Sequence, residues 1–198
     1  MLKTTTNYEK HSNKNPFQQF LINRFYKKLF EIIKPLKPNS VLDAGAGEGF
    51  TLVKLARCKI GKRVEGIDNS ERAVKIGKKM YPGLNLIQGD IYNLPYKDNS
   101  FDIVLCTEVL EHLEDPGRAL EELKRVTKKY IMLTVPNEPF FRLANFFRGK
   151  YILNFGNHPE HINLWTSHSF ENFVKSKKLR ISSKKYSFPW TLILARKQ

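Results

Sequence analysis

Three side chains capable of acid–base or metal chemistry stand close together in the second half of the chain. Glu108, Glu111 and His112 are three and four residues apart, so on a helical turn they would share one face. His158 and His161 follow downstream, again three residues apart. Carboxylates and imidazoles act as general bases and also bind divalent metals. The pattern predicts a catalytic cluster of Glu108, Glu111, His112 and His161, with a metal site as an open alternative for which no ligand set is assigned.

A glycine-rich loop lies earlier in the chain, in the segment DAGAGEG at 43–49. Its alternating glycines allow a tight turn and a close approach of a ligand to the backbone. A dinucleotide fingerprint that begins at Gly45 would need glycine or alanine at position 50, where Phe50 stands. Asp43 and Glu48 would also meet a pyrophosphate with negative charge. The loop therefore argues against a nicotinamide dinucleotide and favours a ligand with a cationic or zwitterionic centre.

Two more carboxylates follow apolar runs that read as strands. Asp68 stands about twenty residues past the glycine loop, where a strand-end carboxylate is placed to accept both hydroxyls of a ribose. Asp90 follows the next run. Each residue alone could be only a helix cap or a turn former. Ligands of open α/β sheets bind beyond the carboxyl ends of the strands, however, and there Asp43, Asp68, Asp90 and Glu108 would share one site.

The elements that must position these residues alternate along the chain. Apolar residues at helical spacing predict an amphipathic helix from Pro16 to Pro35. The remaining pattern predicts strands at 41–42, 63–67, 84–88, 101–106, 130–135, 179–187 and 190–197, and helices after the glycine loop and at 70–80, 115–127 and 166–177. Alternating strands and helices predict a doubly wound α/β fold with a mostly parallel, seven-stranded sheet and helices on both faces.

The length of 198 residues suits a single domain over 1–198. We expect an N-terminal lid helix over 1–38, to which Tyr8, His11, Phe17 and Phe20 would belong. A cofactor-binding core would follow over 39–136, then a cap insertion over 137–165 and a closing helix with two strands over 166–198. The insertion holds many aromatic residues between basic ones, which suggests either an apolar substrate pocket or a lipid-facing surface.

Composition points to a globular protein, with 41% hydrophobic and 27% charged residues. Two distant cysteines predict neither a disulfide framework nor a zinc site. No signal peptide or long apolar run is visible, so we expect a soluble, cytoplasmic protein, as a monomer or homodimer. The net charge of +15 comes from the regions 1–40 and 142–198. It suggests an anionic partner such as RNA, an acidic small molecule or a membrane surface, or only a lysine-rich solvated surface.

The stretch VLDAGAGEG at 41–49 resembles motif I of the class I S-adenosylmethionine-dependent methyltransferases, in their type 11, small-molecule-like branch. The resemblance extends over about 39–136 and implies S-adenosylmethionine as the cofactor. It implies that Asp68 accepts the ribose hydroxyls and that the stretch 101–113 faces the methyl-transfer centre. The implied cofactor-binding residues are Asp43, Gly45, Ala46, Gly47, Asp68, Asn69, Asp90, Ile91 and Glu108. One departure is VTKKY before the fifth strand, where the family often has a Pro-Gly-Gly turn.

Three functions remain open on the sequence. The leading hypothesis is methyl transfer to an oxygen, nitrogen or carbon of a small molecule bound near Glu108, His112 and Asn137. The alternative is a metal-dependent RNA 2′-O-methyltransferase, because E-x-x-E-H and paired histidines are similar to that branch and the basic flanks suit RNA. A catalytically silent subunit that only binds the cofactor is the third.

Overall fold

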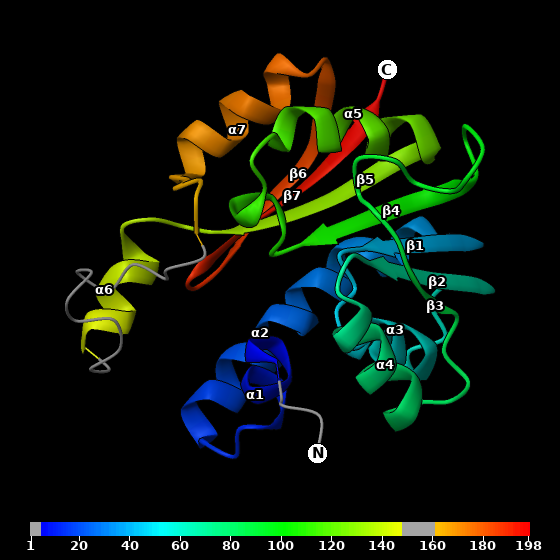
Figure 1. Ribbon diagram of the computed structural model, residues 1–198. Coiled ribbons are helices and arrows are strands. Elements are labelled where there is room, and N and C mark those ends of the chain that lie inside the picture. Colours follow the sequence, from blue (N-terminus) through cyan, green and yellow to red (C-terminus); the bar gives the residue numbers. More distant parts are fainter. Residues whose placement is uncertain (1–4, 148–160) are drawn as a thin grey trace.

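A seven-stranded sheet in the order β3-β2-β1-β4-β5-β7-β6 forms the middle layer of the computed structural model, which describes residues 5–147 and 161–198 (Figure 1). The parallel strands are β1 (Ser40–Ala44), β2 (Arg63–Asp68), β3 (Leu86–Gln88), β4 (Phe101–Thr107) and β5 (Thr127–Pro136). β7 (Trp190–Lys197) runs antiparallel between β5 and β6 (Leu179–Ser187). The predicted doubly wound fold with a mostly parallel, seven-stranded sheet is confirmed.

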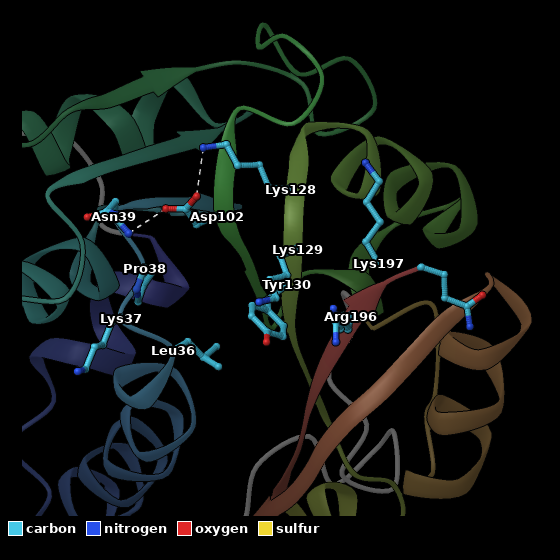
Figure 2. Close-up of a pocket in the computed structure, with 11 residues that line it drawn as sticks. Leu36, Lys37, Pro38, Asn39, Asp102, Lys128, Lys129, Tyr130, Arg196 and Lys197 are labelled. Carbon is cyan, nitrogen blue, oxygen red and sulfur yellow. Dashed lines mark hydrogen bonds and ion pairs between the residues drawn. The ribbon is translucent and has the colours of Figure 1, made fainter.

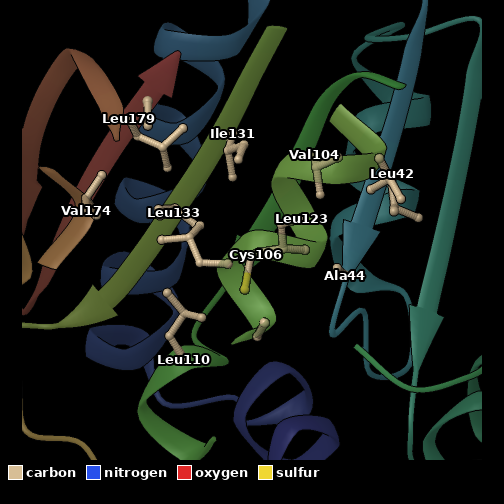
Figure 3. Close-up of a cluster of buried hydrophobic side chains, with 14 of the residues drawn as sticks. Leu42, Ala44, Val104, Cys106, Leu110, Leu123, Ile131, Leu133, Val174 and Leu179 are labelled. Carbon is tan, nitrogen blue, oxygen red and sulfur yellow. The ribbon is translucent and has the colours of Figure 1, made fainter. Parts of the chain in front are cut away.

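Helices cover both faces of the sheet. α5 (Pro116–Val126) and α7 (Ser167–Ser176) pack on one face, while α2 (Pro16–Ile33), α3 (Phe50–Arg57) and α4 (Glu71–Met80) pack on the other (Figure 1). In Figure 3, Leu123 of α5 and Val174 of α7 contribute to the same buried cluster as Leu133 of β5. Strands buried on both faces explain the continuous apolar runs of β4 and β5.

Local sequence sets where the helices begin. The Ser70 hydroxyl accepts from the Ala73 amide at 3.2 Å and starts α4, and the Asp115 carboxylate accepts from the Arg118 amide at 2.9 Å and starts α5. Thr166 caps α7 through a capping box. The helices predicted at 70–80, 115–127 and 166–177 are therefore present, and their bounds differ from the predicted ones by one residue at one or both ends.

Several elements differ from the prediction. α1 (Thr6–Ser12) was not predicted, and α6 (Phe140–Phe147) forms within the cap insertion. β3 is shorter than the predicted 84–88 because it is an edge strand that pairs only with β2. β5 is longer than the predicted 130–135 because β4 and β7 hold it on both sides. The helix expected to reach Pro35 ends earlier, and a 3₁₀ turn, η1 (Lys34–Leu36), follows it.

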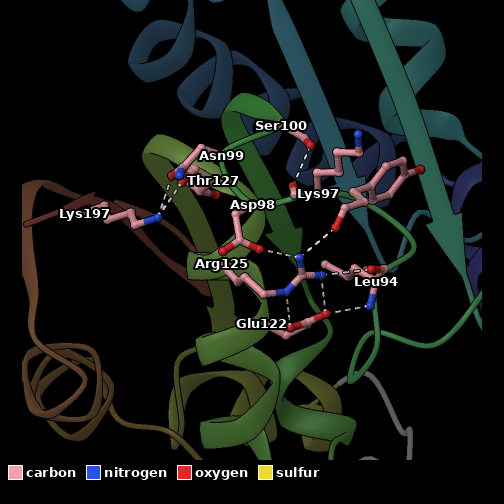
Figure 4. Close-up of polar contacts among 10 residues, drawn as sticks. Leu94, Lys97, Asp98, Asn99, Ser100, Glu122, Arg125, Thr127 and Lys197 are labelled. Carbon is pink, nitrogen blue, oxygen red and sulfur yellow. Dashed lines mark hydrogen bonds and ion pairs between the residues drawn. The ribbon is translucent and has the colours of Figure 1, made fainter.

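Arg125 of α5 holds the connection between β3 and β4 (Figure 4). Its guanidinium donates to both carboxylate oxygens of Glu122 at 2.7 and 2.8 Å and to Asp98 at 2.9 Å. It also donates to the backbone carbonyls of Leu94 at 2.9 Å and Tyr96 at 2.7 Å. A bidentate, charge-assisted pair of this kind has a defined geometry. The network therefore orders the segment whose first residues are expected beside the adenine.

Two further expectations concern membrane-spanning helices and the two cysteines. Among them, no helix combines the length and the apolar composition that crossing a bilayer requires. Cys58 is exposed, Cys106 is buried, and both are free thiols, as their separation in sequence predicted.

Candidate active site

A cavity of about 590 Å³ lies at the carboxyl ends of β1, β2 and β4, between the glycine loop, α1 and α2. Predicted site residues that line it are Gly45, Ala46, Gly47, Asp68, Asn69, Ile91, Glu108, His112 and His161. Asp43, Asp90 and Glu111 are not among its lining residues. Most of the residues singled out by sequence therefore come together at one site, from elements that are far apart along the chain.

The glycine loop adopts a backbone that ordinary residues avoid. Gly45, Gly47 and Gly49 have φ of 85°, 54° and 81°. A Cβ on Gly45 would stand 2.3 Å from Cγ2 of Val109, which follows β4. Left-handed backbone and close packing together require glycine at this position. The loop thereby leaves the main chain open toward the cavity.

Asp68 holds the loop in place from the end of β2. Its Oδ2 accepts from the Gly47 amide at 2.7 Å, and its Oδ1 accepts from the Ser70 amide at 2.9 Å. Burial raises the pKa of the Asp68 carboxyl, and these two backbone amides act in the opposite direction. Each oxygen keeps lone-pair capacity toward the cavity, since a carboxylate oxygen accepts more than one hydrogen bond.

Asp43 at the end of β1 is only 1% exposed, and its Oδ1 has no hydrogen-bond partner among the described residues. Burial, and then the nearby charge of Asp68, raise the pKa of the Asp43 carboxyl to about 7. A buried carboxyl with one unpartnered oxygen is costly, and a cation close to it would lower that cost. The region behind the glycine loop therefore favours a positively charged ligand group.

Glu48 has a different role from the one its sequence position suggested. Glu48, which the sequence argument placed where a pyrophosphate would meet it, is fully buried and does not line the cavity. Its carboxylate accepts hydrogen bonds from the Thr5 hydroxyl and the Asn7 side-chain amide. Glu48 therefore fastens the start of α1 onto the glycine loop.

α1 covers the cavity and supplies a residue that the sequence did not single out. Lys10 donates to both carboxylate oxygens of Glu108 at 2.7 and 2.6 Å. Burial alone would raise the pKa of Glu108, but the charge of Lys10 brings it below its ordinary value. His11 stacks on Phe50 with ring centroids 4.3 Å apart, and burial, followed by the charge of Lys10, lowers its pKa to about 3. The only signal for this helix was Thr5, whose side chain caps it.

Of the other residues assigned to the N-terminal lid, His11 and Phe17 line the cavity, whereas Tyr8 and Phe20 do not. Phe17 and Phe20 are both more than half exposed, so neither is packed on the sheet edge.

The predicted helical face shared by Glu108, Glu111 and His112 is wrong. Glu108 has a φ of 57° and precedes the 3₁₀ turn η2 (Leu110–His112), so it does not share a helical turn with the other two. The ligand atoms of Glu111, His112 and His161 instead all lie within 4.8 Å of one another. His158, the other histidine of the pair, lies outside the described residues.

Backbone contacts bring His161 to this group. The amides of Ile162 and Asn163 donate to the Glu111 carbonyl at 2.8 and 3.0 Å. Glu111 is 1% exposed, and neither of its carboxylate oxygens has a hydrogen-bond partner in the described part of the chain. Burial, and then the charge of Glu108, raise the pKa of Glu111 well above its ordinary value. The arrangement can hold a proton or a cation between one carboxyl and two imidazoles.

Several segments that form the cavity are similar in sequence to known proteins. The family model of a methyltransferase domain matches residues 42–132, which include the glycine loop, Asp68 and the whole of β4. The matched segment is 91 of the 198 residues, and it supports a class I S-adenosylmethionine-dependent methyltransferase.

Two curated relatives and one solved structure illustrate the range of this family. The demethylmenaquinone methyltransferase of Thermotoga maritima is 31% identical over 106 residues, which are 54% of this chain and 46% of the relative. The 2-methyl-6-phytyl-1,4-hydroquinone methyltransferase 1 of Oryza sativa subsp. japonica is 30% identical over 143 residues, or 70% of this chain and 43% of the relative. The structure of magnesium protoporphyrin IX methyltransferase from Synechocystis PCC 6803 with bound SAH superposes with a TM-score of 0.70 at 17% identity and covers 98% of this chain and 95% of its own. The chain thus spans less than half the length of these two curated relatives.

The protein has a second groove at the opposite edge of the sheet, with a volume of about 610 Å³ (Figure 2). It lies where β1 and β5 begin and β7 ends. Its basic lining residues are Lys37, Lys128, Lys129, Arg196 and Lys197. Asp102 stands among them, accepts from the Asn39 amide at 2.8 Å and pairs with Lys128 at 3.1 Å. Basic side chains therefore gather far from the cavity that holds the predicted site residues.

Proposed function

We propose that this methyltransferase transfers the methyl group of S-adenosylmethionine to a small, apolar acceptor. The observation that carries the proposal is an acid-lined cavity closed by a glycine loop of left-handed backbone. Its charged lining residues are Lys10 against Glu9, Asp68 and Glu108. Such a balance suits a cofactor that carries a sulfonium and an ammonium and no phosphate.

The cofactor-binding residues divide the ligand between them. Asp68 accepts the two ribose hydroxyls with the lone pairs that its backbone contacts leave over. Asn69, which follows β2, contacts the adenine together with Asp90 and Ile91 at the start of the connection that Arg125 orders. The buried carboxyl of Asp43 and the backbone of Gly45 to Gly47 attract the ammonium group.

S-adenosylmethionine, when bound, supplies an electrophilic methyl group on a positively charged sulfur. The chain orients the acceptor and excludes water, because in-line placement of the reacting atoms provides most of the rate in such a reaction. His112 and His161, whose rings lie 5.0 Å apart at the cavity wall, take up the acceptor proton. Glu111 lies within 4.8 Å of both imidazoles, while Lys10 keeps Glu108 charged beside the cofactor.

The rest of the cavity wall suits an apolar acceptor. Its apolar lining residues include Phe17, Leu21, Ile22, Phe25, Phe141 and Trp190. Relatives that share the core are named for quinone and hydroquinone acceptors, one with a phytyl chain. Both observations support a ring-bearing, poorly soluble acceptor over a phosphorylated one.

The test is calorimetric titration with S-adenosylmethionine and its demethylated product. Asp68→Ala removes charge-assisted hydrogen bonds to the ribose and is expected to weaken binding by about 10- to 100-fold. Glu71→Ala is the matched control, because it removes a carboxylate that is 61% exposed three residues away and leaves the cavity intact. Equal affinity in Asp68→Ala and Glu71→Ala would overturn the assignment. Turnover with an acceptor separates the enzyme from a catalytically silent cofactor-binding subunit.

A second candidate is metal assistance of the same reaction, supported by the unpartnered oxygens of Glu111 beside His112 and His161. One carboxylate and two imidazoles are a donor set for a first-row divalent metal such as Mn²⁺ or Zn²⁺. These three residues would hold the ion, which would supply Lewis-acid activation of an acceptor hydroxyl. Calorimetric titration with MnCl₂ tests this directly. A wild type that binds no metal, or a Glu111→Gln variant that binds it equally well, would contradict the metal site.

RNA is not the acceptor that we propose. The hypothesis rested on the E-x-x-E-H pattern with its paired histidines and on the large positive charge, yet the cations lining a groove gather at the sheet edge opposite the cavity. The cavity itself is acid-lined, which would repel a phosphate backbone.

A further inference from the structure

Large exposed apolar side chains gather at one edge of the molecule. Six of them are between 46% and 62% exposed and form what we call the apolar rim: Phe17, Phe20, Phe140, Leu143, Ile162 and Leu164. The remaining two among the described residues, Tyr186 and Phe188, lie beside the turn between β6 and β7. All eight therefore belong to segments at the cavity edge of the sheet, and the opposite edge has none among the described residues.

The elements explain this distribution. α2 begins at the cavity, and its first two turns carry Phe17, which lines the cavity, and Phe20, which is exposed beside it in sequence. α6 follows directly from the carboxyl end of β5 and carries Phe140 and Leu143, while its neighbour Phe141 lines the cavity. In Figure 1, α1, the start of α2 and α6 lie along the lower left of the molecule. The apolar rim thus borders the route into the cavity from two sides.

The charges between these side chains all have one sign. The segments 13–24, 140–147 and 161–166 contain Lys14, Arg24 and Arg142 and no aspartate or glutamate. A second copy of the chain, docked symmetrically on this surface, would place these cations against one another. Exposed aromatic and aliphatic side chains interleaved with Lys and Arg instead complement an interface between acyl chains and anionic headgroups.

We propose that the apolar rim docks on an anionic lipid membrane and that the acceptor is a lipid-soluble molecule that enters the cavity from the bilayer. The part that concerns the acceptor rests on the proposed function. Phe17 and Phe141 continue from the rim into the cavity wall, so an apolar acceptor would meet a continuous apolar path. Docking this way leaves the basic groove of Figure 2 facing away from the membrane.

The experiment is sedimentation with vesicles of equimolar phosphatidylcholine and phosphatidylglycerol, compared with vesicles of phosphatidylcholine alone. Phe20→Ser/Leu143→Ser removes two rim side chains that do not line the cavity and is expected to lower the partition coefficient by at least about tenfold. Lys14→Gln/Arg142→Gln is expected to weaken binding to the anionic vesicles only, because it removes headgroup attraction. Lys129→Gln/Arg196→Gln, which removes the same charge from the opposite edge, is the matched control and is expected to bind like the wild type.

Several outcomes would overturn the proposal. The wild type could fail to sediment with either vesicle, or the opposite-edge variant could lose binding as much as the rim variants, which would make the effect one of net charge alone. A dimer in analytical ultracentrifugation that Phe20→Ser/Leu143→Ser dissolves would assign the rim to a second copy instead. Calorimetric titration with the demethylated cofactor, run on the same samples, shows that each variant is folded. It also separates failure of the proposed function from failure of membrane docking, since vesicle binding does not require the cofactor.

Discussion

Replacing Gly45 with alanine tests whether the left-handed backbone and the close packing of the glycine loop require glycine at this position. The new Cβ would lie 2.3 Å from Cγ2, 3.1 Å from Cγ1 and 3.3 Å from Cβ of Val109. A β-branched side chain has little rotamer freedom with which to avoid the contact. The loop or the residue after β4 must therefore shift.

Two unfavourable contributions lower the free energy of unfolding of Gly45→Ala. A φ of 85° disfavours any residue with a Cβ by about 1–2 kcal/mol. The contact with Val109 adds an overpacking cost of about 1–3 kcal/mol. The free energy of unfolding should fall by about 2–5 kcal/mol, a large share of the stability of a typical domain.

Urea unfolding measures this loss, and the double variant Gly45→Ala/Val109→Ala separates its two parts. Truncating Val109 relieves the contact but not the backbone strain, so the double-mutant cycle should show a favourable coupling of about 1–3 kcal/mol. Gly83→Ala is the control, because a Cβ there meets no atom within 4 Å. A loss in Gly45→Ala no larger than in Gly83→Ala, or a coupling near zero, would refute the reasoning.

Three further variants test the site and its supports. The pKa of Asp43 is raised from 3.8 to about 7, so the stability that its protonated form provides is fully present below pH 3.8 and is lost as pH rises through 7. The unfolding free energy of the wild type, measured relative to Asp43→Asn, should therefore fall by about 1.4 kcal/mol per pH unit across this range. A difference that does not change with pH would contradict the assignment. Arg125→Met leaves the two backbone carbonyls that bind its guanidinium without a donor, so the free energy of unfolding in urea should fall by about 1–3 kcal/mol. Lys75→Met is the control: it loses one exposed ion pair, and its free energy of unfolding should fall far less. Lys10→Met releases α1 from Glu108, so hydrogen exchange of the α1 amides should accelerate; unchanged exchange would show that the ion pair does not hold this helix.

The net charge of this chain does not indicate where its charged side chains gather in the folded protein. The net charge of +15 is visible in composition, but only the folded sheet shows that a basic groove lies at one edge and an acid-lined cavity at the other. The strand order brings the start of β1, the start of β5 and the end of β7 to one edge, although they are far apart in sequence. Composition records how many charges a chain has, and topology decides where they gather.

Local sequence determined most of the fold. Apolar runs, helical periodicity and capping residues such as Ser70 and Asp115 act over a few residues, so the parallel core and the place of the glycine loop could be predicted. The position of Asp68 at the cavity could be predicted as well, because the end of a parallel strand beside a glycine loop is a position that the fold itself defines.

The relative placement of Glu108, Glu111, His112 and His161 was decided by tertiary structure. Spacing placed Glu108 with Glu111 and His112, yet the left-handed backbone of Glu108 and its contact with Lys10, 98 positions away, separate it from them. Glu48 was buried by α1, and His161 was brought to Glu111 through the backbone of the following residues. Sequence spacing specifies neighbours within one turn or strand. Which distant side chain neutralises a buried carboxylate depends on the packing of whole elements, and here only the assembled sheet and its covering helices determine it.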